Sequence, residues 1–393
     1  MSVLVLADER DPSADAMVLE LEERGVEVHR LDTVWFPAQL SLSARLRVGR
    51  WAGHLCTEYR TVELEAIHAV WYRSPRAYRF PPELNTVELD HAKVEAKYGL
   101  GGVLMSLPVL WVNHPFRLAD SAYKPFQLAV AARCGLNVAD TLITNSKASV
   151  ASFANEGKTV TKMLGAVSIV EGGIRKFAYT DPVDDADLGD LRGMEVTAHQ
   201  IQRWVPKKYE ARTFVVGDHI TTVAIYAHST SGYIDWRTGY DSNTYELIDP
   251  PASVASGVRR VMTEMRLVYG AFDFIIGPDD TWTFLEVNAG GQYGWIEEVT
   301  GAPITGQLAE LLTKGNQRPR SRLTGPRTLS GWPRFCGIAA TSARPSGARP
   351  SPPCPAMYSC LKPTNRTTRP DGCAARPPVT GSGSTRRGHW SRP

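Results

Sequence analysis

Apolar residues cluster in short runs near the start of the chain, with a helical repeat between them. Val3–Ala7 and Val26–Leu31 are predicted as buried strands, and Ala14–Arg24 is predicted as a helix that stops at Gly25. A strand, a helix and a second strand in this order favour a parallel α/β unit. The same criteria predict the other elements of this first part: strands at Ile67–Tyr72 and Val109–Val112, and a helix at Glu88–Leu104.

The rest of the chain is richer in strands. Helices are predicted over Ala119–Cys134, ending at Gly135, and over Ser253–Tyr269. An acidic stretch, Asp181 to Asp190, lacks the glycine and the terminal glutamate of a calcium loop, so we predict a solvated loop there. The apolar periodicity ends after Leu312. The predicted strands are Thr141–Thr144, Thr159–Met163, Ser168–Val170, His199–Val205, Arg212–Val216, Ile220–Tyr226, Gly270–Ile276 and Trp282–Asn288.

The charges divide the chain at residue 317. The whole sequence of 393 residues sums to +3, but residues 317–393 carry +13 and residues 1–316 carry −10. The same 77 residues hold 13 of the 27 prolines and four of the six cysteines, none of them with the Cys-x-x-Cys spacing of a metal site. We therefore predict a folded body that buries roughly three quarters of its unfolded surface and a disordered Arg/Pro-rich tail over 317–393.

Two origins of this tail fit its composition. Arg, Pro, Ala, Gly, Ser and Thr dominate it, a mixture that GC-rich DNA gives when it is read out of frame. The abrupt change after Gly315 therefore suggests a frameshift. The alternative is a genuine disordered basic extension.

Several classes of protein are not expected. The chain reaches Asp8 and Glu9 after a short apolar run, which is unlike a secretory signal. The longest apolar stretch, Gly102 to Val112, falls well short of the ~20 residues that span a bilayer. The two cysteines of the body, Cys56 and Cys134, have no paired spacing. We expect a soluble, cytoplasmic protein with no membrane partner.

The most informative stretch is a predicted β-hairpin near the end of the body. Gly277-Pro-Asp-Asp280 predicts a turn between two apolar strands. A symmetric turn pairs Ile276 with Thr281. The same register places Asp273 opposite Phe284.

Candidate metal ligands follow from this pairing. Because strand side chains alternate, one face of the hairpin is predicted to hold four residues: Asp273, Phe284, Glu286 and Asn288. The two carboxylates are then diagonal neighbours, roughly 7–8 Å apart at the backbone. Two carboxylates and a carboxamide are hard oxygen ligands suited to Mg²⁺. The alternative is a hairpin whose polar face is simply exposed to solvent.

A second set of candidates is mostly cationic. Lys124 begins an amphipathic helix, and Lys162 lies in an apolar strand, where a lysine either snorkels or meets an anion. Glu210 and Arg212 are two apart on one predicted strand face, and Arg237 follows. Singly, each is more often a surface residue. Together with two Mg²⁺ ions they would balance the hairpin carboxylates and a nucleotide triphosphate of about −4.

The order of these candidate residues along the chain resembles that of the ATP-grasp carboxylate–amine ligases. It is more similar still to that of the ATP-grasp maturases of ribosomally made peptides, the graspetide or microviridin-type macrocyclases. The resemblance covers residues 1–316, and the stretches that carry it are Val70-Trp-Tyr-Arg73, Gly135-Leu-Asn-Val-Ala-Asp-Thr-Leu-Ile-Thr-Asn145, Tyr209-Glu-Ala-Arg-Thr-Phe-Val-Val-Gly-Asp218 and Phe284-Leu-Glu-Val-Asn-Ala-Gly-Gly-Gln-Tyr293.

The resemblance implies an α/β (α+β) chain with a three-part ATP-grasp fold. Its parts would be a parallel α/β pre-ATP-grasp domain over 1–117, a central subdomain over 118–203 and a C-terminal subdomain over 204–316 that carries the metal hairpin. The sequence departs from the family at Met163 and Ala289, where relatives often have proline. Both departures affect loop rigidity more than chemistry.

The resemblance also implies site roles. The residues that would contact ATP, from its phosphates and adenine to its ribose, are Lys124, Lys162, Gln202, Arg203, Trp204, Val205 and Glu210. Those that would hold Mg²⁺, expected as two ions, are Asp273, Glu286 and Asn288. Those that would stabilise an acyl phosphate are Arg212 and Arg237.

The implied function is an ATP-dependent ligase that closes rings in a precursor peptide. ATP would activate an Asp or Glu side chain of the peptide as an acyl phosphate, and a Thr or Ser hydroxyl or a Lys amine would attack it. The expected partners are the precursor peptide with its leader segment and a second copy of the chain in a homodimer.

Two alternatives stay open. One is a ligase that adds free amino acids to a protein or peptide; mass separates the two, because ring closure loses water whereas addition gains a residue. The other is a nucleic-acid-binding protein that uses the basic tail. With few aromatic residues between its arginines, that tail favours only nonspecific attraction to phosphate, so we do not expect a nucleic-acid partner.

Overall fold

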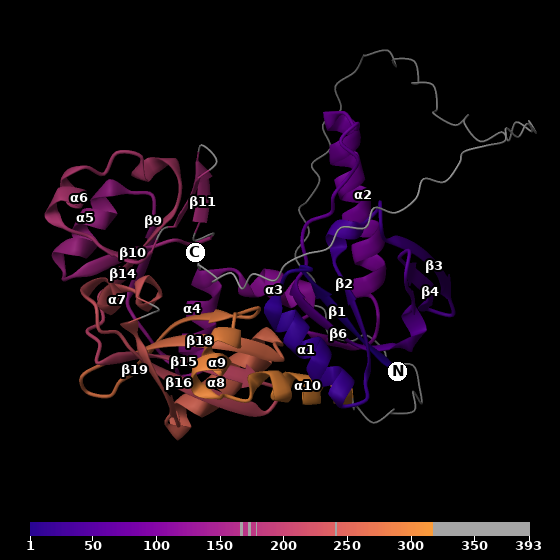
Figure 1. The fold of residues 1–393 in the computed structure, drawn as a ribbon. Helices are drawn as coiled ribbons and strands as arrows, with labels where there is room; N and C mark the ends of the chain where they lie inside the picture. The colour runs from indigo at the N-terminus through magenta and orange to yellow at the C-terminus, as the bar shows by residue number, and fades with distance from the viewer. Residues whose placement is uncertain (166–167, 172–173, 178, 240–241, 317–393) are drawn as a thin grey trace, which may run out of the picture. The chain divides into compact units, whose positions relative to one another are not determined.

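A computed structural model describes residues 1–165, 168–171, 174–177, 179–239 and 242–316 (Figure 1). The predicted tail over 317–393 lies outside the described residues. The α/β fold class is confirmed, because a four-stranded parallel sheet and mostly antiparallel sheets of up to six strands are combined with helices. Among the described helices, none is both long and apolar enough to cross a membrane.

The first 112 residues build a four-stranded sheet in the order β2-β1-β6-β7. Every neighbour in this sheet pairs in parallel, as the strand–helix–strand start predicts. The strands are β1 (Ser2–Ala7), β2 (Glu27–Leu31), β6 (Ile67–Ser74) and β7 (Leu110–Val112). Its helices are α1 (Pro12–Glu23), which Asp11 caps by accepting from Ser13 N and Ala14 N, and α2 (Thr86–Met105).

Residues 41–63, for which the sequence analysis predicts no element, form a small antiparallel sheet. It comprises β3 (Ser41–Arg47), β4 (Arg50–Cys56) and β5 (Thr61–Glu63) in the order β3-β4-β5. Two 3₁₀ turns flank it, η1 (Thr33–Trp35) and η2 (Leu64–Ala66). The strands carry arginines and serines on their exposed face, which hides the apolar alternation from sequence analysis.

The helix predicted over 119–134 is wrong as a single element. The structure has α3 (Pro115–Ser121) and α4 (Lys124–Arg133) instead. The break falls just before Pro125, because a proline ring cannot continue a helix from the turn before it but fits the first turn of a new one. Lys124 is therefore the first residue of α4, as predicted.

A second antiparallel sheet has the order β13-β10-β14-β9. Its strands are β9 (Thr141–Thr144), β10 (Thr159–Lys162), β13 (Asp181–Pro182) and β14 (His199–Arg203), and α5 (Lys147–Asn155) packs beside it. β11 (Ser168–Glu171) and β12 (Ile174–Phe177) form a separate hairpin. The acidic stretch predicted as a loop contains β13 and a short helix, α6 (Asp185–Gly189). Asp184 caps α6 by accepting from Asp187 N, which offsets the low helix propensity of aspartate.

The largest sheet is six-stranded, in the order β17-β16-β15-β18-β19-β8. Its strands are β8 (Asn137–Val138), β15 (Tyr209–Val216), β16 (His219–Tyr226), β17 (Thr244–Ile248), β18 (Tyr269–Ile276) and β19 (Trp282–Asn288). The helices of this part of the chain are α7 (Thr230–Ile234), η4 (Trp236–Thr238), α8 (Ala252–Met265), α9 (Gly294–Thr300) and α10 (Ile304–Lys314), whereas η3 (Met194–Val196) precedes β14 and packs with the second antiparallel sheet. α8 ends four residues before the predicted Tyr269, because Arg266 takes a left-handed conformation (φ 54°).

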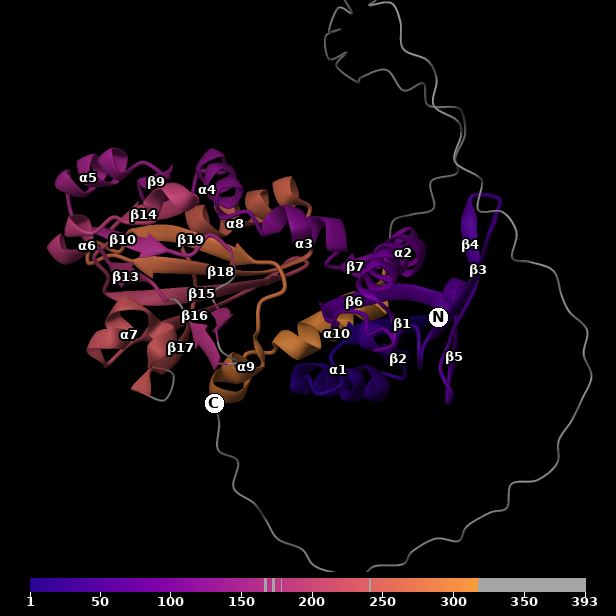
Figure 2. The ribbon, with the colours of Figure 1, turned by 90° about the horizontal axis from the view of Figure 1, so that it is seen from above.

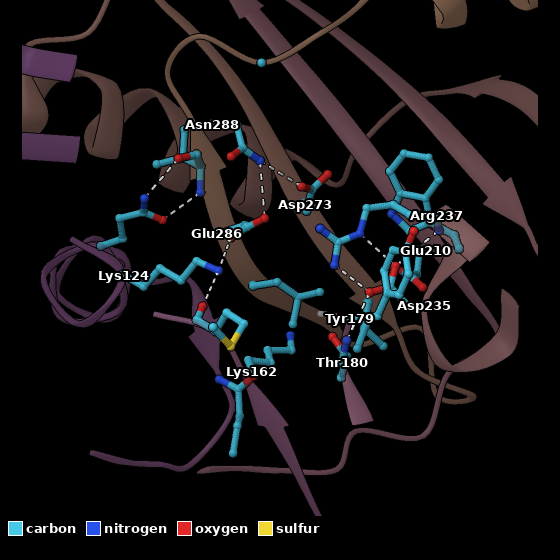
Figure 3. A pocket seen from close by; sticks show the side chains of 18 of the residues that line it. Lys124, Lys162, Tyr179, Thr180, Glu210, Asp235, Arg237, Asp273, Glu286 and Asn288 are labelled. Atoms are coloured by element: carbon cyan, nitrogen blue, oxygen red, sulfur yellow. Dashed lines mark hydrogen bonds and ion pairs between the residues drawn. The ribbon is translucent and has the colours of Figure 1, made fainter. Parts of the chain in front are cut away.

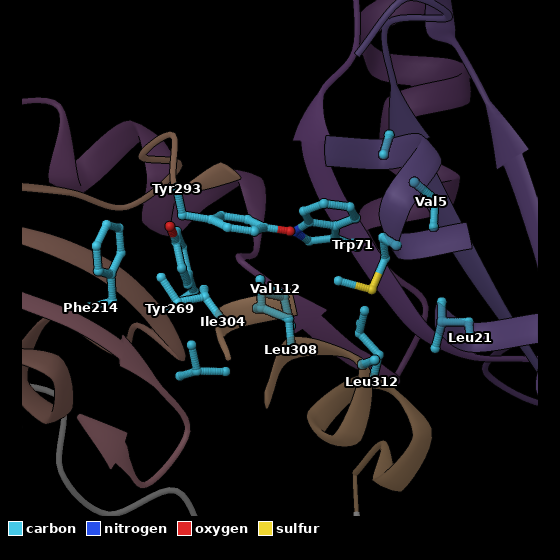
Figure 4. Packing of buried hydrophobic residues seen from close by; sticks show 14 of the residues in the cluster. Val5, Leu21, Trp71, Val112, Phe214, Tyr269, Tyr293, Ile304, Leu308 and Leu312 are labelled. Atoms are coloured by element: carbon cyan, nitrogen blue, oxygen red, sulfur yellow. The ribbon is translucent and has the colours of Figure 1, made fainter. Parts of the chain in front are cut away.

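Two apolar cores flank the largest sheet. α4 and α8 cover one face, against which Phe272, Phe274, Phe284 and Val287 are buried. In Figure 2 these two helices lie on one side of β18 and β19, and α10 lies between the sheet and α1. Leu308 and Leu312 of α10 belong to one buried cluster with Met17 and Trp71 (Figure 4), so the last described helix joins the largest sheet to the parallel one.

Two buried polar side chains tie the parallel sheet to the segment after β19. Asn113 follows β7; its Nδ2 donates to Tyr269 O and Ala289 O, each at 2.7 Å. Arg73 near the end of β6 donates to Gly290 O at 3.1 Å and to the Gln292 side chain. These contacts fix the backbone that follows Asn288 and thereby position one wall of the site.

Candidate functional site

A cavity of about 840 Å³ opens between the β10–β14 sheet and the inner face of β15, β18 and β19. Every residue that the sequence analysis assigns to a site lines it: Lys124, Lys162, Gln202, Arg203, Trp204, Val205, Glu210, Arg212, Arg237, Asp273, Glu286 and Asn288. Figure 3 shows Lys124 entering the cavity from the start of α4 and Lys162 entering it from β10. Asp273 and Glu286 enter it from the hairpin. The structure therefore gathers residues up to 164 positions apart in sequence, from Lys124 to Asn288, around one cavity.

The register of the hairpin differs from the predicted one. Ile276 pairs with Trp282, and Thr281 lies in the turn, where its carbonyl accepts from Gly277 N at 2.9 Å. The turn is one residue longer because Asp280 adopts a left-handed conformation with φ 62°. A symmetric four-residue turn was therefore the wrong assumption.

A bulge between Asp273 and Phe274 then realigns the strands. Phe274 faces Phe284, and Asp273 lies directly opposite Glu286 instead of diagonal to it. Phe284 is fully buried in the core behind the sheet, so its predicted place on the polar face is wrong, whereas Leu285 lines the cavity. The extra residue in β19 is what brings the two carboxylates into register, since a bulge re-aims the side chains that follow it.

Protein cations hold both carboxylates in the described structure. Arg212 Nη1 lies 3.0 Å from Asp273 Oδ1, and Lys124 Nζ lies 3.1 Å from Glu286 Oε2. Asn288 Nδ2 donates to Asp273 Oδ2 at 3.1 Å and to Glu286 Oε1 at 3.4 Å. The three hairpin side chains thus converge on one point.

The environment shifts the pKa values of Asp273 and Glu286 in opposite directions. Burial raises the pKa of Asp273 to about 6; Arg212 opposes the rise and Glu286 adds to it. Burial also acts to raise the pKa of Glu286, but Lys124 and Lys162 lower it below its ordinary value. The hairpin therefore holds one firmly ionised carboxylate and one whose ionisation a nearby cation would favour.

The donor set fits a hard divalent cation. Asp273 and Glu286 offer carboxylate oxygens from opposite strands, and rotation of the Asn288 amide would present its oxygen to the same point. Burial is the main cause of the elevated pKa of Asp273, the neighbouring Glu286 adds to it, and a bound cation would oppose both effects. No group of three or more His, Cys, Asp or Glu among the described residues could hold a metal, so the set depends on Asn288 as third ligand.

Lys162 gives the cavity a cationic side wall. Burial lowers its pKa, which Glu286 and Glu210 oppose. Within the described part of the chain its ammonium makes no ion pair or hydrogen bond that neutralises it. Lys124, in contrast, also donates to Met163 O at 2.8 Å and so links α4 to the end of β10. A partly buried lysine without a carboxylate partner is suited to meet an anionic ligand.

Arg237 is held by a bidentate pair with Asp235. The Arg237 Nε lies 2.8 Å from Asp235 Oδ1, and its Nη2 contacts the other carboxylate oxygen. This pairing and the nearby acids Glu286 and Asp273 raise the pKa of Arg237. Asp235 also accepts from Thr180 N at 3.3 Å, so the segment before β13 and the segment between α7 and η4 together fix the arginine at the cavity wall.

The residues predicted to contact ATP at the end of β14 divide between the cavity and the surface. Gln202 is buried and donates to Thr141 Oγ1 at 2.8 Å, and the indole of Trp204 lies beneath Lys158 at 4.4 Å. The Arg203 guanidinium turns away to the C-terminus of α5, where it donates to Gly157 O at 2.7 Å. Of Arg203, only the backbone is therefore placed to contact a ligand, because successive side chains of a strand point to opposite faces.

Two cavity residues escape the sequence analysis. Lys207 forms a buried ion pair with Glu210, and burial raises the pKa of that carboxyl in spite of the pairing. In sequence Lys207 is one of two adjacent lysines, the pattern of a solvated loop. Gln127 packs against β19; the signal for it is a polar residue on the face of α4 that otherwise carries Leu128 and Ala131.

Comparisons with known proteins place these observations in a family. Residues 2–118 match the family model described as the MvdD pre-ATP grasp domain. A comparison with curated proteins finds no match.

Three solved structures are similar over most of the chain. Macrocyclase MdnC from Microcystis aeruginosa, bound with its precursor peptide MdnA, is 28% identical with a TM-score of 0.71, covering 80% of this chain and 100% of MdnC. A RiPP-associated ATP-grasp ligase of Chryseobacterium gregarium, in complex with ADP and a leader and core peptide, is 26% identical with a TM-score of 0.75 over 80% of this chain and 97% of its own. Macrocyclase MdnB from Microcystis aeruginosa is 25% identical with a TM-score of 0.66, over 79% and 98%. The resemblance seen in the sequence is confirmed: this chain is an ATP-dependent ligase, its residues 2–118 match a pre-ATP-grasp domain, and it is similar to the ATP-grasp macrocyclases of ribosomally made peptides.

Proposed function

We propose that the protein closes rings in a ribosomally made precursor peptide, joining Asp or Glu side-chain carboxylates to Thr, Ser or Lys side chains. The observation that carries the proposal is the convergence of Asp273, Glu286 and Asn288 with four cations around one cavity. Such a site can hold a polyphosphate and leaves room for a second, peptidic substrate. The precursor peptides bound to the similar enzymes support a peptide partner.

The nucleotide end of the site lies between β10, β14 and β15. Lys124 and Lys162 contact the phosphates and the adenine of ATP, and the backbone of Gln202, Arg203, Trp204 and Val205 forms the hinge that holds the base. Glu210 faces the ribose while it keeps its ion pair with Lys207. The ammonium of Lys162, which has no ion pair among the described residues, supports its role at an anion.

Asp273, Glu286 and Asn288 hold Mg²⁺, and we propose two ions there. When bound, these ions neutralise the phosphate oxygens and help to align the γ-phosphoryl group. The residues themselves supply a rigid set of oxygens on adjacent strands. Lys124 and Arg212, which pair with Glu286 and Asp273 in the described structure, become available to the phosphates once cations take their place.

Arg212 and Arg237 act on the reacting groups. The peptide carboxylate attacks the γ-phosphorus of ATP, and ADP leaves with the electron pair of the broken P–O bond. A hydroxyl or amine of the same peptide then attacks the acyl carbon. The ester or amide forms, and the phosphate leaves and takes up the proton of the nucleophile. Once the ligands are bound, the two guanidinium groups stabilise the charge that develops in both steps, and no covalent enzyme nucleophile is needed.

The decisive experiment is mass spectrometry of peptides incubated with the enzyme, ATP and Mg²⁺. The substrates to test are short peptides rich in Thr or Ser and in Asp or Glu, each with its leader segment, from any open reading frames found next to the gene. Loss of one water per ring, with one ADP formed for each, is the expected result. A gain of one amino-acid residue would instead establish the amino-acid-adding alternative, and no ATP-dependent change in mass would refute both.

Three further expectations stand as proposals beside this function. The three parts of the body divide near residues 117, 203 and 316, the leader segment contributes to binding, and the active protein is a homodimer. Limited proteolysis tests the first, leaderless peptides test the second, and sedimentation measures the third.

A further inference from the structure

The outer edge of β19 is supported by a side chain where it carries the candidate ligands. Among the described residues, the strand on this side, β8, pairs only with Thr283 and Phe284. The backbone around Val287 therefore has no strand neighbour there, and its polar groups need another partner. Gln127, from the buried face of α4, fills this place.

The Gln127 amide imitates a neighbouring strand. Its Nε2 donates to Val287 O at 3.0 Å, and its Oε1 accepts from Val287 N at 2.8 Å. Nε2 also donates to Ser121 O, which closes the turn between α3 and α4. Gln127 is only 4% exposed, so its donor and acceptor groups are engaged and shielded from water.

The position of this contact matters because of its neighbours on both elements. Val287 lies between Glu286 and Asn288, and its side chain is buried in the core, so fixing its backbone fixes the direction of both neighbours. Gln127 lies one helical turn beyond Lys124, on the helix whose first residue reaches Glu286 at 3.1 Å. One amide thus sets the distance between the start of α4 and the candidate ligands.

We propose that Gln127 is a positioning residue that holds β19 and α4 in the register required for Mg²⁺-dependent nucleotide binding. The proposal rests on the proposed function, because it assigns the Mg²⁺ to Glu286 and Asn288. Groups that orient metal ligands without touching the metal commonly change metal affinity by 10–100-fold when they are removed. A residue that served packing alone would lower stability and leave the Mg²⁺ dependence unchanged.

The test is calorimetric titration of the full-length protein with ADP at a series of Mg²⁺ concentrations. In Gln127→Met, which keeps the volume and removes the hydrogen bonds, we expect the Mg²⁺ concentration for half-maximal ADP binding to rise about tenfold. Gln307→Met is the matched control, because Gln307 is half-buried on α10 and, among the described residues, its side chain hydrogen-bonds only to Thr221 Oγ1, at 3.3 Å. The control should bind as the wild type does.

A second variant keeps the test decisive if Gln127→Met does not fold. Gln127→Glu retains the bond from Val287 N but turns a carboxylate oxygen toward Val287 O. Its added negative charge alone would strengthen Mg²⁺ binding, so a rise in the required Mg²⁺ concentration would report the displaced strand and support the proposal. Wild-type Mg²⁺ dependence in a folded Gln127 variant overturns this inference alone, whereas a wild type that does not bind MgADP overturns it together with the proposed function.

Discussion

Arg212 and Asp273 face each other across β15 and β18, with the guanidinium 3.0 Å from the carboxylate and both side chains about nine-tenths buried. A candidate catalytic arginine and a candidate metal ligand thus neutralise each other in the described structure. Either partner alone would be an uncompensated buried charge. Under the proposed function, ligand binding exchanges this ion pair for contacts from Asp273 to Mg²⁺ and from Arg212 to phosphate, so that the two residues change partners together.

The hairpin acids should be required for turnover and dispensable for folding. Asp273→Asn and Glu286→Gln are expected to abolish ADP formation with peptide present, because each removes a carboxylate from the set proposed for Mg²⁺. The buried face of the hairpin, Phe272, Phe274, Phe284 and Val287, is unchanged, so circular dichroism and denaturation should show a folded protein. Near wild-type turnover by either variant would contradict the assignment.

The arginines should act on the chemistry and not on peptide affinity. Replacement of Arg212 or Arg237 by Ala is expected to lower the rate of the chemical step by about 3 kcal/mol of barrier, the scale of one lost oxyanion donor. Single-turnover kinetics measure this rate, and titration with the precursor peptide should give nearly unchanged affinity. Weak peptide binding with normal turnover at saturation would assign the arginines to peptide recognition.

Lys207 and Lys208 offer a matched pair of neighbouring lysines. Lys207 is 7% exposed and paired with buried Glu210, so Lys207→Met should lower the free energy of unfolding by about 3–5 kcal/mol. Lys208 pairs with Asp280 in an exposed position, and Lys208→Met should cost less than about 1 kcal/mol. Urea denaturation measures both, and equal effects would show that the buried pair is not specially stabilising.

The titration of Asp273 should appear in the stability of the metal-free protein. Its pKa of about 6 in the folded state exceeds the ordinary 3.8, so the folded protein holds this proton more tightly than the unfolded chain. The contribution of Asp273 to stability is therefore present below about pH 4 and is lost as the pH rises through about 6. Relative to wild type, Asp273→Asn should gain on the order of 3 kcal/mol between pH 4 and pH 7 with a chelator present. A difference that does not vary with pH would show that Asp273 keeps an ordinary pKa.

The basic tail should be dispensable for activity. If residues after Gly315 result from a frameshift, a protein ending there should keep full ligase activity and solubility, since all candidate site residues precede residue 289. The matching genetic test is translation of the DNA in the other two frames from codon 315, which should give a short terminus of ordinary composition. An inactive or insoluble truncated protein would show that the tail is functional.

The sequence by itself determined the parallel start, most strands and a set of candidate residues that line one cavity, because these depend on local periodicity and on residue chemistry. Glu286 and Asn288 are two apart on one strand, so any register would leave them on the same side. The sequence could not show that Asp280 lengthens the turn, or that a bulge sets Asp273 opposite Glu286 and sends Phe284 to the core. It also could not show that the side-chain amide of Gln127 on α4 hydrogen-bonds to the backbone of Val287. Those features depend on backbone conformations and on partners up to 160 residues away, which only the packed sheet and its flanking helices decide.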